Sequence, residues 1–222
     1  MLCSLNEIEA QLRKAARGAG LSWGLAEEAG KAARWLAMHG IGCLPSFVAL
    51  FEQHSSRPYD EISIPQEEGR WRARGGALCP LIAGTAIVDR AEEIAGGRNV
   101  ELATVAWPVL LAPFAATVAN ATGASIVLAW PGARFIFADT GVRLDATPGV
   151  TADVAGAASA HYASCGRLVG TAQGAPVKSE IAGIFVDDSV WSRLDAFVQR
   201  TYVPASEESR LKGAGAGLLD TD

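Results

Sequence analysis

The residues best suited to bind an anion lie near the two ends of the chain. An arginine presents parallel donors to a carboxylate or phosphate, and a lysine adds a compact positive charge. Glycines that follow Arg210 would let the backbone close over a ligand, whereas the alternative is a frayed C-terminus with Arg210 in solvent. Our candidate ligand-binding residues are Arg17, Lys31, Arg34, Tyr202, Ser209 and Arg210.

Two neighbouring glutamates, Glu27 and Glu28, lie between these cations in the sequence and are the candidates for catalysis. A carboxyl group acts as a general acid or base when its surroundings move its pKa toward neutrality. The simpler alternative is that both acids lie in the first turn of a helix and stabilise its dipole. The catalytic hypothesis requires the start of the chain and its tail to meet around one cleft.

No sequence motif indicates a metal site or a cofactor site. The three histidines are scattered, with no metal-ligand spacing, and no phosphate-binding loop or nucleophile elbow is present. We therefore expect no metal and no cofactor. His161 and Cys165 would share one face of a helix, where an imidazole could activate the thiol, but a strand would separate them and leave a structural cysteine.

The composition excludes some partners. A net charge of −5 and a pI near 5.3 give no basic footprint, so we expect no nucleic acid. Four widely spaced cysteines and the absence of a signal segment favour a reducing cytoplasm. The uncharged stretch 102–133 is long enough to span a bilayer, but its prolines and glycines divide it into core-sized pieces, so we expect no membrane partner.

Two helices joined by a glycine-containing turn must position the first group of candidates. Ser4 and Glu7 have the spacing of a capping box, which predicts a helix from there to about Ala16. A second helix is predicted from about Trp23 to Met38. Because a helix precedes the glycines at 18–24, they indicate a close-packed turn more than a dinucleotide-binding loop.

The rest of the chain predicts helices and an antiparallel sheet. Helices are expected over 46–53, 80–95, 113–120 and 190–198, with an exposed loop over 54–69. Strands are expected over 125–130 and 133–138, as a hairpin, and over 142–144, 150–154 and 181–186. The fold class is therefore α+β, with an N-terminal helical hairpin and further helices packed on a mainly antiparallel sheet. We expect one globular domain over 1–210 and a Gly/Ala-rich tail over 211–222.

Two blocks resemble an uncharacterised bacterial family, the domain of unknown function DUF3726. The first block runs from Ser4 through Lys14-Ala-Ala-Arg-Gly-Ala-Gly-Leu-Ser-Trp-Gly to Leu36, and the second from Thr201 to Asp222. The resemblance implies no established activity. We expect a metal-independent cytoplasmic enzyme or binder of a small anionic metabolite. The alternative is an accessory protein that forms a homo-oligomer, burying apolar pieces such as 107–114, together with the C-terminal tail, against a second copy.

Overall fold

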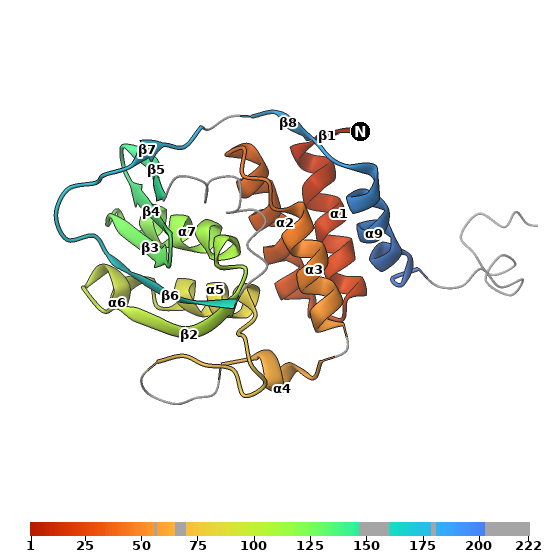
Figure 1. Cartoon of the computed structure of the whole chain (residues 1–222), viewed down its shortest axis with the longest axis horizontal. Helices are drawn as coiled ribbons and strands as arrows, with labels where there is room; N and C mark the ends of the chain where they lie inside the picture. The colour runs from red at the N-terminus through yellow and green to blue at the C-terminus, as the bar shows by residue number, and fades with distance from the viewer. Residues whose placement is uncertain (56, 65–69, 147–159, 179–180, 203–222) are drawn as a thin grey trace, which may run out of the picture.

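The molecule places a group of helices beside a sheet that carries its own helices (Figure 1). The computed structural model describes residues 1–55, 57–64, 70–146, 160–178 and 181–202. The helical side is built from the first third of the chain and from the last helix. The sheet side is built from most of the chain between them.

The predicted helical hairpin is confirmed. Helix α1 (Leu5–Gly18) begins at the capping box, where the Ser4 hydroxyl accepts from the Glu7 N–H at 3.3 Å and the Glu7 carboxylate accepts from the Ser4 N–H at 2.8 Å. These hydrogen bonds hold the pKa of Glu7 below its usual range because they stabilise the ionised carboxylate. Helix α2 (Trp23–Met38) begins after the cap at Ser22 and packs along α1.

Further helices cover the hairpin. Helix α3 (Leu44–His54) has the position expected for 46–53, and the short α4 (Tyr59–Ile62) interrupts the expected loop. The predicted last helix is α9 (Asp188–Gln199), which begins where the Asp187 carboxylate accepts from the Ser189 N–H at 2.7 Å. It packs against α1 and α3, so the end of the described chain returns to its beginning.

The main sheet is antiparallel and follows the strand order β2-β6-β3-β4-β5-β7. The expected hairpin at 125–138 is confirmed, with Val127 opposite Ile136. Three of its members, β2, β6 and β7, were not predicted. The strands are β2 (Val100–Ala106), β3 (Ile126–Trp130), β4 (Ala133–Ala138), β5 (Gly141–Ala146), β6 (Ala160–Arg167) and β7 (Ala175–Pro176).

Helices pack against the sheet. The helix predicted over 80–95 is two helices, α5 (Pro80–Asp89) and α6 (Ala91–Ala95), because the backbone leaves the helical region at Arg90. A turn of 3-10 helix, η1 (Pro108–Leu111), leads into α7 (Ala112–Thr122), which extends the helix predicted over 113–120. Within α5, Gly84 lies against the Phe114 ring, and a Cβ there would come within 2.3 Å of it.

One expected strand pairs elsewhere. The run at 181–186 forms β8 (Gly183–Phe185), which pairs with β1 (Leu2–Ser4) in a separate two-stranded sheet on the helical side and does not join the main sheet. The strand expected over 150–154 lies outside the described residues. The uncharged stretch 102–133 is divided among β2, η1, α7 and β3. Within the described part of the chain, no helix has both the length and the hydropathy to cross a bilayer.

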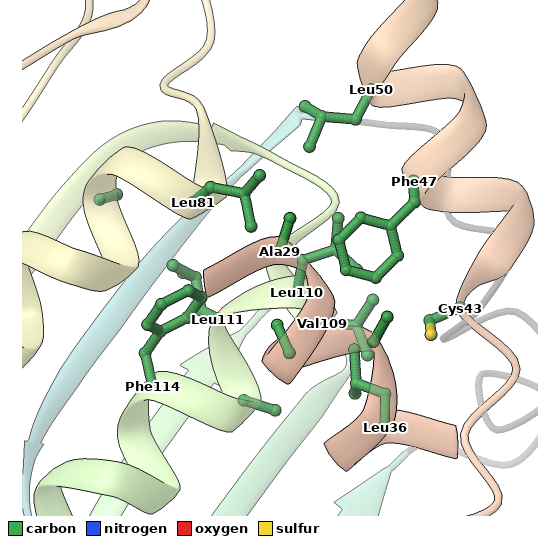
Figure 2. Close-up of a cluster of buried hydrophobic side chains, with 14 of the residues drawn as sticks. Ala29, Leu36, Cys43, Phe47, Leu50, Leu81, Val109, Leu110, Leu111 and Phe114 are labelled. Carbon is green, nitrogen blue, oxygen red and sulfur yellow. The ribbon is translucent and has the colours of Figure 1, made fainter. Parts of the chain in front are cut away.

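The core lies where the helical side meets the sheet side (Figure 2). Leu36 of α2, Phe47 of α3, Leu81 of α5 and Leu110 of η1 are fully buried there and come from four different elements. Because residues 108–112 and Phe114 are buried inside the chain itself, the expectation that 107–114 covers a second copy is wrong. Self-association through some other surface stays a prediction.

Candidate anion-binding cleft

A cleft of about 370 Å³ lies between the end of α1, the start of α2 and the residues that follow α9. Residues that follow the last helix therefore meet the N-terminal hairpin here, in keeping with the packing of α9 on α1 (Figure 1). The described residues that line the cleft are Arg13, Lys14, Arg17, Trp23, Glu27, Thr201 and Tyr202.

The helical repeat of α1 places its cations in the cleft. Residues at positions i, i+1 and i+4 project from one side of a helix, and Arg13, Lys14 and Arg17 have this spacing. The opposite side of α1 carries the buried residues Ile8, Leu12, Ala15 and Ala16, which pack into the core. Burial of that apolar side therefore fixes the direction in which the three cations point.

A glycine allows α9 to close the cleft. A Cβ at Gly18 would lie 1.8 Å from the Phe197 carbonyl oxygen, so only a residue without a side chain permits this approach of the two backbones. Beyond α9, the Thr201 N–H donates to the Val198 carbonyl oxygen at 2.9 Å and the Tyr202 N–H donates to the Gln199 carbonyl oxygen at 3.3 Å. These bonds hold the chain in a turn that ends on the cleft.

Positive charge predominates in the cleft. The Arg13 guanidinium forms an ion pair with Glu27 at 3.3 Å. Arg17 donates to the Leu21 carbonyl oxygen at 2.5 Å, and its guanidinium carbon lies 4.9 Å from the centre of the Trp23 ring. Lys14 forms no ion pair with any described residue. The described lining thus holds three cations and one carboxylate, and this carboxylate already has a partner.

Arg17, Glu27 and Tyr202 are the three predicted site residues that the structure brings together. Glu28 and Lys31 lie outside the cleft and pair with each other at 2.7 Å, and this hydrogen bond raises the pKa of Lys31.

Arg34 lies near the start of α1, where it hydrogen bonds to Asn6 and is 3.6 Å from the Glu9 carboxylate. It is therefore also absent from the described lining of the cleft. Ser209 and Arg210 lie outside the described residues.

Sequence reasoning missed four residues of the cleft: Arg13, Lys14, Trp23 and Thr201. The signal for the first three was available. In an antiparallel hairpin the last turn of the first helix lies beside the first turn of the second, so residues 13–17 and 23–27 must be neighbours. Thr201 had no such signal, because its place depends on how α9 packs.

The other candidate chemistry does not form. His161 and Cys165 lie four positions apart on strand β6, which is extended, so the helical arrangement of the pair is wrong. Cys165 is fully buried, and burial raises the pKa of its thiol to about 12. Among the described residues, no group of three or more His, Cys, Asp or Glu side chains could hold a metal ion.

Residues 3–79 match the model of a family described as a protein of unknown function, DUF3726. This match confirms the resemblance seen in the N-terminal block. It covers α1, α2 and α3, and with them every cation of the cleft's described lining, whereas Thr201 and Tyr202 lie outside it. No curated protein matches this chain.

Proposed function

We propose that this protein binds a small anionic metabolite in the cleft between α1, α2 and the end of α9. The observation that carries the proposal is the gathering of Arg13, Lys14 and Arg17 around one hollow in a chain whose net charge is −5. A basic hollow on an acidic protein focuses the electrostatic potential and attracts small anions.

The aromatic side chains suggest which anions fit. Trp23 is 67% exposed and Tyr202 is 54% exposed, although large aromatic side chains usually bury most of their surface. Each would gain by covering its ring with an apolar or planar group. We therefore propose a ligand that combines a carboxylate or phosphate, held by the cations, with a planar part that packs on Trp23.

Binding is better supported than catalysis. A general base needs a carboxylate that is free to reach the substrate, whereas the Glu27 carboxylate is held by Arg13 and Glu28 lies outside the cleft. In our proposal Glu27 orients Arg13 toward the ligand. If the protein is instead an enzyme, Glu27 is the acid/base, and Glu27→Gln would abolish turnover while preserving affinity.

We also propose that the protein works in a reducing compartment. All four cysteines are free thiols with buried side chains. Burial raises the pKa of both Cys43 and Cys79 to about 12, which keeps these thiols protonated and inert. Unpaired cysteines of this kind support a cytoplasmic location, because secreted proteins commonly join theirs in disulfides.

Calorimetric titration with phenyl phosphate and inorganic phosphate at low ionic strength tests the proposal. We expect phenyl phosphate to bind more tightly, and we expect Trp23→Ala to remove that difference. The double variant Lys14→Gln/Arg17→Gln should weaken both probes by about tenfold or more, because hydrogen bonds to charged groups are lost.

The matched control is Arg72→Gln/Arg74→Gln, which removes the same charge from two residues outside the cleft. This control should bind both probes as the wild type does. Equal weakening by the two double variants would reduce the effect to general electrostatics and reject a specific cleft.

A further inference from the structure

A second hollow, of about 610 Å³, lies where the end of α2 faces strand β5. It is separate from the basic cleft, because no described residue lines both. Its walls come from the turn after α2, from the sheet, and from the segment around β7 that leads back to the helical side (Figure 1). The described lining is mainly apolar: Ile41, Phe135, Leu144, Ala146, Ala175, Pro176, Val177 and Ile181.

Backbone hydrogen bonds hold the outer wall on both sides. On the sheet side, the Val177 N–H donates to the Val142 carbonyl oxygen at 2.9 Å. On the helical side, the Ile181 N–H donates to the Met38 carbonyl oxygen at 3.1 Å. The lack of a side chain at Gly40 leaves room for Ile181, because a Cβ at Gly40 would lie 2.8 Å from the Ile181 Cδ1. The hollow is therefore a built feature of the fold that joins its two sides.

One polar side chain is fixed in this apolar lining. His39 is 8% exposed, and its ring stacks on Trp35 with 3.9 Å between the ring centres. The His39 Nδ1 lies 2.8 Å from the Trp35 carbonyl oxygen. A carbonyl oxygen only accepts, so Nδ1 carries the hydrogen, and in the neutral ring Nε2 presents a lone pair. No described residue donates a hydrogen bond to Nε2.

Charged groups lie at the rim of the hollow. Asp145 and Lys178 line it but are exposed, unlike His39. An apolar body inside the hollow would leave water, and a polar end directed outward would stay solvated. Among the described residues of this lining, His39 is thus the buried polar side chain in largely apolar surroundings.

We propose that this hollow is a binding site for an apolar small molecule whose inner end carries one hydrogen-bond donor, a hydroxyl or ring N–H, that donates to Nε2 of His39. The stack on Trp35 and the hydrogen bond from Nδ1 to the Trp35 carbonyl oxygen hold the His39 ring in one orientation before the ligand binds. The site takes uncharged donors, so it differs in chemistry from the basic cleft.

Two probes that differ by one hydroxyl group test this site in the intact protein. 4-Methylphenol carries the donor, and toluene lacks it. We expect 4-methylphenol to bind about fivefold to tenfold more tightly, which is the value of one hydrogen bond. We also expect 4-methylphenol, and not toluene, to move the ¹⁵N resonance of the His39 Nε2 in the wild-type protein, a readout that needs no variant.

Two variants separate the parts of the proposal. His39→Phe keeps a ring on Trp35 and should bring the two affinities together. Ile181→Trp fills the hollow and should weaken both probes. Failure of the wild type to bind either probe, equal affinities, or an unmoved Nε2 resonance would overturn the proposal. Because the probes are uncharged, Lys14→Gln/Arg17→Gln should leave their binding unchanged, so either site can fail without the other.

Discussion

The basic cleft and the His39 hollow obtain their chemistry in different ways. In the cleft, three cations on α1 and two exposed aromatic side chains surround a solvent-facing hollow. In the other hollow, one buried imidazole lies among apolar side chains from the turn after α2, the sheet and the segment around β7. The cleft is therefore a charged site on the surface, whereas the His39 hollow is continuous with the hydrophobic core.

This difference separates what affects stability from what affects binding. Side chains of the cleft project away from the core, so most can change without loss of the fold. Side chains of the His39 hollow also pack the core, so changes there alter both properties. Three measurements of unfolding test this contrast.

The largest expected effect belongs to Phe135, which lines the His39 hollow and is fully buried, with its ring centre 5.7 Å from that of Trp130. Phe135→Ala should lower the free energy of unfolding by about 3–5 kcal/mol in urea denaturation, because it removes a large core side chain. The comparison variant from the cleft is Trp23→Ala, which should cost less than about 1 kcal/mol. Similar losses in the two variants would erase the distinction between core and surface hollows.

His54 gives the helical side a sensitivity to acid. It is buried, and neither ring nitrogen has a hydrogen-bond partner in the described part of the chain. Burial and then the charge of Arg57 lower the pKa of His54 from 6.5 to about 4. The unfolded chain therefore binds a proton in this range while the folded protein does not, so stability is complete above pH 6.5 and falls as pH drops toward 4.

Protonation of His54 should lower the free energy of unfolding by about 3 kcal/mol in total. His54→Leu should remove that part of the pH dependence, measured as the difference in urea unfolding between the variant and the wild type across the range. Parallel curves for the two proteins would show that His54 titrates normally in the folded state. His54 lies beside the turn that joins α1 to α2, so the result also tests how tightly that turn is packed.

Gly18 should show a smaller effect, with a direct consequence for the cleft. Gly18→Ala forces α9 away from α1 and should cost about 1–3 kcal/mol in urea unfolding, with weaker binding of phenyl phosphate as Tyr202 moves. Gly24→Ala is the matched control, since Gly24 lies in a helix and a Cβ there would meet nothing within 4 Å. It should stabilise the protein by about 0.5–1 kcal/mol. Equal effects of the two alanines would mean that α9 is not closely packed.

Local signals in the sequence predicted much of the helical side. Ser4 with Glu7, and the apolar stripe of α2, identify the hairpin because capping and helical periodicity act over a few residues. The hairpin at 126–138 followed from its two apolar runs.

Strands β2 and β6 lacked a comparable signal. The alternation of β2 is broken where its pairing register shifts between Leu102 and Val105, so its apolar residues do not keep a period of two. Strand β6 consists largely of small and polar residues, which have little strand preference of their own. Only their pairing with each other and with β3 makes these segments strands.

The two hollows also differ in how far local sequence signals could predict them. Arg17 and Glu27 could be placed together from the hairpin alone, whereas Arg34 was misplaced because it faces Asn6 at the other end of the helix pair. The His39 hollow had no sequence signal, since its walls come from segments as far apart as the turn after α2 and the residues around β7. Tertiary packing alone creates such a site.

NMR of the intact, ¹⁵N-labelled protein titrated with phenyl phosphate would locate the bound anion directly. We expect the arginine side-chain resonances of Arg13 and Arg17 and the indole N–H of Trp23 to shift together with one dissociation constant. Shifts confined to other basic residues, such as Arg72 and Arg74, or no saturable shift at all, would contradict this expectation.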